Sequence, residues 1–292
     1  MTQVTRGVYP AIVTPFDEDG EVDYEALTDV VRHVEAGGVD GVVPCGSTGE
    51  SATLTHEEHK RVVEHVVDVS DTRVIAGTGS NSTHEALELT RHAADAGADG
   101  ALLISPYYNV PNDRGLVSHH LRIADEVDLP QILYNVPGRT GHDVPDDVVV
   151  ELAEHPNVAG VKEASGDINK ISRLCRRTAD HDFDVVSGDD SMTLPLLSVG
   201  GTGVISVAAN VAPDSVVDLH RATEDEDWSR ARREHQRLMP LFDALFVETN
   251  PIPAKIAMAE LGLCDERLRL PLSADVPQES RDTVLDALET HV

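Results

Sequence analysis

The chain has 292 residues and carries 52 Asp and Glu against 23 Lys and Arg, a formal net charge of −29 at pH 7. Because the acidic residues run through the whole chain, anionic partners are disfavoured, and we expect no binding to nucleic acid or to an anionic membrane surface. The length accommodates one large α/β barrel or two average domains.

The acidic composition also predicts a halophilic protein. At about 1 M salt the Debye length falls to roughly 3 Å, which screens the repulsion between surface carboxylates. We therefore expect folding that depends on salt, and the alternative is an acidic enzyme that is indifferent to salt. Three widely separated cysteines, no signal-peptide core and no bilayer-length apolar run predict a soluble protein of the reducing cytoplasm.

Short apolar runs alternate with amphipathic helical stretches along most of the chain, which is typical of repeated β/α units on a parallel sheet. Strands are expected at 8–14, 41–44, 74–76, 101–104, 131–134, 158–162, 183–187 and 203–206, and the first intervening helices at 24–36, 56–69 and 83–96. After residue 212 the pattern becomes helical, over 214–224, 227–247, 252–261 and 278–290.

These elements predict a (β/α)8 TIM barrel over residues 1–224 with an appended helical region over 225–292. An open doubly wound sheet would require a glycine-rich phosphate-binding turn after its first strand. Pro15-Phe16-Asp17 is not such a turn. In a barrel of this kind the chemistry lies at the carboxyl ends of the strands.

Lys162 is the most informative residue at these strand ends. The chain has four lysines, and this is the one that ends an apolar strand. Burial favours the uncharged amine, which can attack a ketone and form a Schiff base. The ordinary interpretation is a lysine that reaches solvent or pairs with Glu163.

Other chemical groups follow neighbouring strands. Tyr134 ends the fifth strand and can carry protons to and from an imine, or it can simply cover the core. Gly46-Ser47-Thr48-Gly49 offers hydroxyls and backbone N–H groups to a small carboxylate, or forms a plain turn. Arg139 is either a bidentate carboxylate ligand or a surface arginine. Together these groups indicate Schiff-base chemistry on a keto acid without a cofactor.

A metal site is a weaker hypothesis. His56 and His59 lie three residues apart with Glu57 between them, but no further ligand follows nearby. We therefore predict no metal.

Several longer motifs extend the pattern along nearly the whole chain. They are Ala11-Ile12-Val13-Thr14-Pro15, Gly46-Ser47-Thr48-Gly49-Glu50-Ser51-Ala52-Thr53-Leu54, Pro106-Tyr107-Tyr108-Asn109, Leu133-Tyr134-Asn135-Val136-Pro137, Val161-Lys162-Glu163-Ala164, Gly203-Val204-Ile205-Ser206-Val207 and Asn250-Pro251-Ile252-Pro253. With them the chain resembles the class I pyruvate-dependent aldolases that include dihydrodipicolinate synthase and N-acetylneuraminate lyase. Gly138-Arg139-Thr140-Gly141 is similar to the synthase branch.

The resemblance implies condensation of pyruvate with aspartate semialdehyde, a lyase reaction of lysine and diaminopimelate biosynthesis. It implies that Lys162 forms the imine, that Tyr134, Ser47 and a neighbouring subunit's Tyr108 relay protons, and that Arg139 orients the semialdehyde. It also implies that the pyruvate site includes Thr48, Ile205 and Gly188. Synthases usually carry threonine where Ser47 stands, and neuraminate lyases usually carry serine.

The resemblance further implies a homotetramer built as a dimer of dimers and feedback inhibition by lysine. The residues that match the lysine site are Ser51, Ala52, His56, His59, Asn81, Glu85 and Tyr107. Two alternatives stay open. One is retro-aldol cleavage of a 2-keto-3-deoxy sugar acid or of N-acetylneuraminate, and the other is a non-catalytic barrel.

Overall fold

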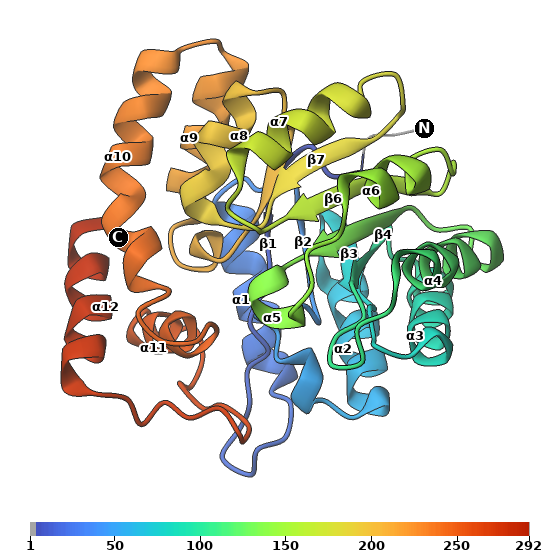
Figure 1. Cartoon of the computed structure of the whole chain (residues 1–292). Coiled ribbons are helices and arrows are strands. Elements are labelled where there is room, and N and C mark those ends of the chain that lie inside the picture. Colours follow the sequence, from blue (N-terminus) through green and yellow to red (C-terminus); the bar gives the residue numbers. More distant parts are fainter. Residues whose placement is uncertain (1–3, 292) are drawn as a thin grey trace.

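The computed structural model describes residues 4–291, and within them eight parallel strands form a barrel in the order β1-β8-β7-β6-β5-β4-β3-β2 (Figure 1). The strands are β1 Gly7–Pro10, β2 Gly41–Val42, β3 Arg73–Gly77, β4 Gly100–Ile104, β5 Gln131–Asn135, β6 Val158–Glu163, β7 Asp184–Ser187 and β8 Gly203–Ser206. The predicted TIM barrel is therefore confirmed.

The barrel closes between its first two strands. The backbone N–H of Val43 donates to Pro10 O at 2.9 Å, and that of Ile12 donates to Val43 O at 3.1 Å. β1 is shorter than the predicted strand 8–14: it ends at Pro10, Ala11 forms only an isolated bridge with Val43, and Val13 N donates to the Asn210 side chain at 3.2 Å.

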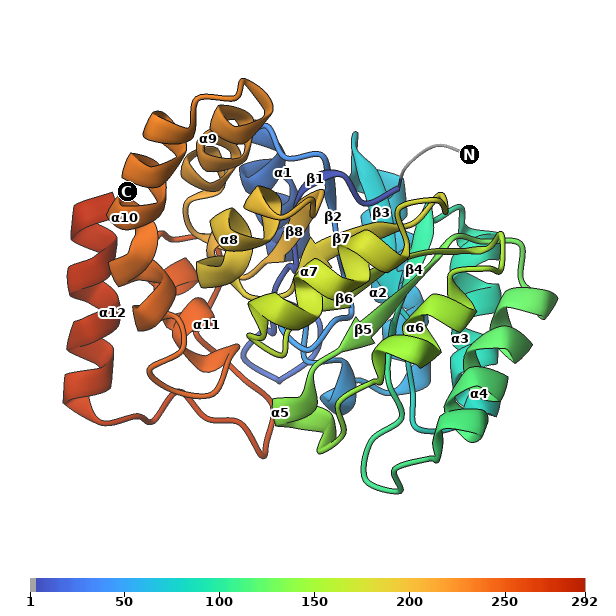
Figure 2. The ribbon, with the colours of Figure 1, turned by 45° about the horizontal axis from the view of Figure 1, so that its top comes forward.

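Helices surround the strands (Figure 2). They are α1 Tyr24–Ala36, α2 His56–Val69, α3 Thr83–Ala96, α4 Asp113–Glu126, α5 Pro137–Thr140, α6 Asp146–Leu152, α7 Ile168–Arg177, α8 Thr193–Ser198 and α9 Pro213–Glu224, with 3₁₀ turns at Ser51–Thr53, Asp190–Met192 and Ala208–Asn210. The predicted bounds of the first three helices are confirmed. Their starts are fixed by side-chain caps, as where Thr55 and Glu58 form a capping box at α2.

The C-terminal region comprises α10 Trp228–Ala244, α11 Ile252–Glu260 and α12 Gln278–His291, which lie together on one side of the barrel in both ribbon views. α12 packs against α10 and α11. One hydrophobic cluster continues from Val8 and Val204 of the barrel to Phe242 and Val284 of this region. The domain division after residue 224 stays a prediction.

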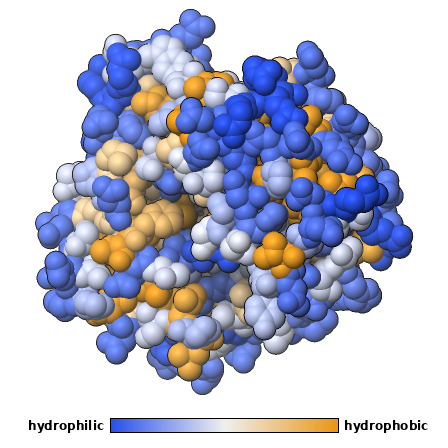
Figure 3. Space-filling view, viewed as in Figure 1, coloured by the Kyte–Doolittle hydropathy of each residue, from blue (hydrophilic) through white to orange (hydrophobic). Residues whose placement is uncertain are grey.

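The face of the molecule in Figure 3 is largely hydrophilic with scattered hydrophobic patches. No helix among residues 4–291 is both long enough and apolar enough to cross a bilayer.

Candidate active site

Lys162 and Tyr134 lie side by side at the ends of β6 and β5. They are direct partners in the parallel ladder, and the lysine Nζ lies 4.3 Å from the centre of the phenol ring. Both side chains are buried, with Lys162 only 5% exposed. Gly188 closes the other side, because a Cβ at this position would come within 2.8 Å of Lys162 Cε. The adjacent strands thus hold amine and phenol together in one buried space.

The surroundings of Lys162 favour its neutral form. Burial lowers the pKa of the amine from 10.5 to about 7, with Asp190 opposing the change and Arg139 adding to it. Glu163 does not compensate the charge, because successive side chains of a strand point to opposite faces, and Lys162 forms no ion pair within the described residues. The hypothesis of a simple Lys162–Glu163 pair is wrong. Near neutral pH, a substantial fraction of this amine is nucleophilic.

Tyr134 keeps its proton over a wide pH range. Burial raises the pKa of the phenol, while the Arg139 charge and a hydrogen bond with the Ser47 side chain act in the opposite direction. A protonated phenol linked to a hydroxyl beside an amine can deliver and recover protons during imine chemistry.

A cavity of about 120 Å³ opens above this pair. Its lining includes six of the residues that the sequence predicts for the site, namely Ser47, Thr48, Tyr134, Arg139, Lys162 and Gly188. Ile205 lies instead in the buried inner cluster with Tyr134 and Val186, and does not line the cavity. Tyr108 is 88% exposed and has a left-handed backbone conformation with φ +70°. Within a single chain it does not join the other groups.

Asn250 lines one side of the cavity, and sequence reasoning assigned it no role. Its side-chain Nδ2 donates to Thr48 Oγ1 at 3.0 Å, and its backbone carbonyl oxygen accepts from Arg139 Nη2 at 2.8 Å. Asn250 therefore connects the two groups that suit substrate carboxylates. Its position inside the motif Asn250-Pro251-Ile252-Pro253 was the available signal, but the motif does not show which side chains it meets.

A larger cavity of about 390 Å³ adjoins the first and does not include Lys162. Its lining contains six of the seven candidate lysine-site residues, namely Ser51, Ala52, His56, His59, Glu85 and Tyr107. Asn81 is exposed and lies outside the lining. Ser47, Tyr134, Arg139 and Asn250 line both cavities, so the two spaces share one wall.

His59 lines the larger cavity as a buried neutral group. Its Nε2 pairs with Gly77 O at 2.8 Å, and burial lowers the pKa of the imidazole to about 4. His56 is exposed. Over residues 4–291, no three His, Cys, Asp or Glu side chains gather as a metal would require.

Two further lysines are buried, although the sequence distinguished only Lys162. Lys255 is fully buried, forms an ion pair with Glu50 at 2.7 Å and lies 4.1 Å from the centre of the Phe16 ring. Because Glu50 follows the Ser47–Thr48 turn, this pair fastens α11 to the loop that carries both hydroxyls. Lys170 is the third buried lysine.

Known proteins resemble the chain over its whole length. The model of the dihydrodipicolinate synthetase family matches residues 4–291. A protein of Methanothrix thermoacetophila named 4-hydroxy-tetrahydrodipicolinate synthase is 55% identical over 283 residues, which cover 97% of this chain and 96% of the relative.

Two solved structures are similar throughout the barrel and the C-terminal helices. The chloride-inhibited dihydrodipicolinate synthase from Acinetobacter baumannii, complexed with pyruvate, has a TM-score of 0.95 at 42% identity and covers 98% of this chain and 99% of its own. The dihydrodipicolinate synthase from Cyanidioschyzon merolae with lysine bound also has a TM-score of 0.95 at 42% identity. The match covers 100% of this chain and 99% of the Cyanidioschyzon chain. The chain therefore belongs to the dihydrodipicolinate synthetase family.

Proposed function

We propose that the protein is a 4-hydroxy-tetrahydrodipicolinate synthase, a lyase of lysine and diaminopimelate biosynthesis. It condenses pyruvate with aspartate 4-semialdehyde through an imine on Lys162. The observation that carries the proposal is a buried amine of lowered pKa against the Tyr134 ring, in a cavity that Arg139 also lines. The names of the family's relatives support the choice of substrates.

The first half of the reaction activates pyruvate. The lone pair of Lys162 Nζ attacks C2 of pyruvate, and loss of the carbonyl oxygen as water leaves a protonated imine. Removal of a proton from C3 then gives the enamine. Tyr134, hydrogen-bonded with Ser47, is placed to move these protons, and Tyr108 of a second copy would extend the relay to solvent. Thr48 binds the pyruvate carboxylate, with Gly188 against the lysine stem and Ile205 beneath the site.

The second half joins the substrates. The enamine carbon attacks the aldehyde of the semialdehyde, whose oxygen takes a proton and becomes the hydroxyl of the product. The semialdehyde amine then attacks C2 of the imine, closes the ring and releases the neutral Lys162 amine. Arg139, held by Asn250, orients the semialdehyde carboxylate for both steps. No cofactor takes part in these steps.

Comparative kinetics in concentrated salt test this function. One sample receives pyruvate with aspartate semialdehyde, and the other receives 2-keto-3-deoxygluconate. We expect turnover in the first sample and little in the second. Faster cleavage of the sugar acid would favour the aldolase alternative, and no imine with pyruvate would favour a non-catalytic barrel.

The larger cavity supports a second site, for lysine as a feedback inhibitor. Its wall carries Glu85 and His56 together with Tyr107, and the related Cyanidioschyzon structure has lysine bound. A homotetramer built as a dimer of dimers would cover the exposed Tyr108 beside this cavity. Initial rates at millimolar lysine test the inhibition, with Glu85→Gln expected to weaken it. Unchanged wild-type rates would contradict the site.

A further inference from the structure

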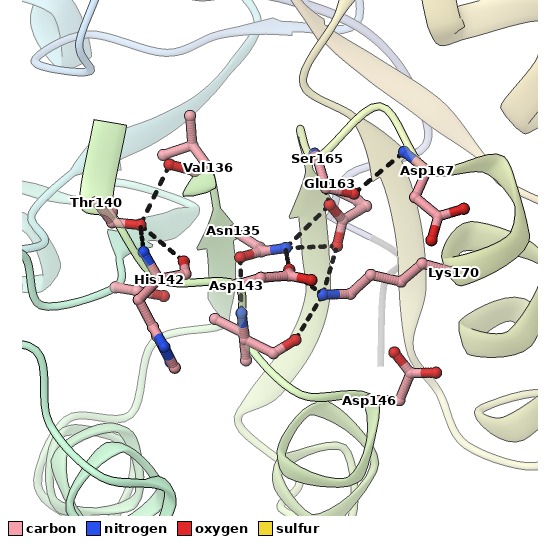
Figure 4. Close-up of polar contacts among 12 residues, drawn as sticks. Asn135, Val136, Thr140, His142, Asp143, Asp146, Glu163, Ser165, Asp167 and Lys170 are labelled. Carbon is pink, nitrogen blue, oxygen red and sulfur yellow. Dashed lines mark hydrogen bonds and ion pairs between the residues drawn. The ribbon is translucent and has the colours of Figure 1, made fainter. Parts of the chain in front are cut away.

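A polar network joins the ends of β5 and β6 to Lys170 of α7 (Figure 4). Asn135 and Glu163 follow Tyr134 and Lys162 and are themselves ladder partners, so their side chains point away from the cavity. Asn135 Nδ2 donates to the two Glu163 oxygens at 3.0 and 2.9 Å, and Ser165 N donates to Glu163 Oε1 at 2.7 Å. The ends of β5 and β6 are thus joined by side chains as well as by the ladder.

In the described part of the chain, Lys170 of α7 is the only cation that forms ion pairs with Glu163 and Asp143, and it is 2% exposed. Its Nζ lies 3.8 Å from Glu163 Oε2 and also donates to Asp143 and, at 2.5 Å, to Val144 O. Burial acts to raise the pKa of Asp143, but hydrogen bonds from Lys170 and Asn135 outweigh it and lower that pKa. A buried ammonium needs such partners, so its position is strongly constrained.

Lys170 contacts Asp143 and Val144, which follow the short helix that carries Arg139. Val144 N donates to Asn135 Oδ1 at 3.0 Å, and Thr140 Oγ1 lies 3.2 Å from Val136 O and 2.9 Å from His142 O. Residues 136–144 therefore form a short segment, which includes α5, and its far end is fixed by Asn135 and Lys170. Arg139, in α5, donates from this segment to the backbone carbonyl of Asn250.

We propose that Lys170 is a positioning residue that sets the placement of the Arg139 guanidinium relative to the Lys162 amine. One ammonium group contacts both the carboxylate next to Lys162 and the segment that bears Arg139. Lys170 thereby fixes the distance between the pyruvate imine on Lys162 and the semialdehyde carboxylate on Arg139. The inference rests on the proposed function, because this distance matters only when both substrates are bound.

Lys170→Met tests the role, with Lys60→Met as the matched control at a partly exposed lysine paired with Glu88. Because a misplacement of about 1 Å between reacting groups costs up to roughly 100-fold in rate, we expect kcat/KM for the semialdehyde to fall by at least about 10-fold. The pyruvate KM and the extent of borohydride trapping at Lys162 should stay within about 2-fold, since the amine and its ladder partner remain. Lys60→Met should leave all three quantities unchanged.

The double variant Glu163→Gln with Lys170→Met separates positioning from stability. It leaves no unpaired charge at the Glu163–Lys170 contact, so its unfolding midpoint should lie nearer to wild type than that of Lys170→Met. The tether to this segment is still missing, and the semialdehyde defect should persist. Recovery of semialdehyde kcat/KM in a stable double variant, or a loss below about 2-fold in folded Lys170→Met, would overturn the positioning role. Wild-type enzyme that trapped pyruvate but condensed no semialdehyde would instead refute the proposed function.

Discussion

Replacing Lys162 by Met should abolish catalysis and stabilise the fold. The pKa of the amine falls from 10.5 to about 7 on folding, chiefly because the group is buried. At about 1.4 kcal/mol per pKa unit, this difference corresponds to a cost of roughly 5 kcal/mol when the folded state must carry the charge. Met fills the same space with an apolar chain and removes that cost.

The pH dependence has a definite sign. Between about pH 7 and the ordinary lysine pKa of 10.5, the unfolded chain binds a proton at residue 162 that the folded chain does not, so wild-type stability rises with pH across this window. The penalty is complete below about pH 7 and disappears near 10.5. The free energy of unfolding of Lys162→Met should exceed that of wild type by this penalty of roughly 5 kcal/mol plus apolar packing below about pH 7. Near pH 10.5 only the contribution of apolar packing should remain.

Urea unfolding in concentrated salt, followed by circular dichroism at about pH 6, 8 and 10, measures this difference. Lys60→Met is the control, because that lysine is only partly buried and its charge remains accessible to water. A Lys162→Met protein no more stable than wild type at about pH 6 would refute the conclusion that folding desolvates the amine.

Three further outcomes follow from the site and the composition. Tyr134→Phe should lower kcat for condensation by about 10² to 10⁴-fold while borohydride still traps the pyruvate imine; condensation at the wild-type rate would exclude the phenol as proton carrier. Arg139→Gln should raise the semialdehyde KM by roughly 10-fold or more with the pyruvate KM little changed, and equal effects on both substrates would contradict a role in orienting the second one. Dialysis from concentrated to low salt should lower the thermal midpoint, because 52 carboxylate side chains then repel one another with only 23 Lys and Arg to offset them; an unchanged midpoint would rule out halophilic behaviour.

The β/α elements and the position of Lys162 could be predicted from the sequence, because each is a local pattern. Eight such elements in order then indicate a barrel. The caps and apolar stripes of α1, α2 and α3 define those helices within a few residues of chain. A lysine at the end of an apolar strand is likewise visible without knowledge of the fold. The predicted strand 8–14 was too long at its end, where Asn210, distant in sequence, accepts the Val13 hydrogen bond in place of a strand partner.

The remaining parts of the site depend on contacts between distant segments. Asn250 reaches Thr48 across 202 residues, and no local pattern indicates that pairing. Lys170 lies in a stretch whose polar pattern is typical of a solvent-exposed helix face, yet Glu163, Asp143 and Val144 O surround it once β6 and α7 pack. Burial of a charged residue follows from its tertiary partners, which the sequence does not order in space.

Covalent capture of pyruvate tests the central claim most directly. The wild-type enzyme, shown to be folded in concentrated salt, is treated with pyruvate and borohydride and then digested for mass spectrometry. The peptide that contains Lys162 should gain the mass of one reduced pyruvate adduct, while peptides containing Lys60, Lys170 and Lys255 remain unmodified. An unmodified Lys162 peptide, or equal labelling of all four lysines, would contradict a uniquely nucleophilic amine at the barrel mouth.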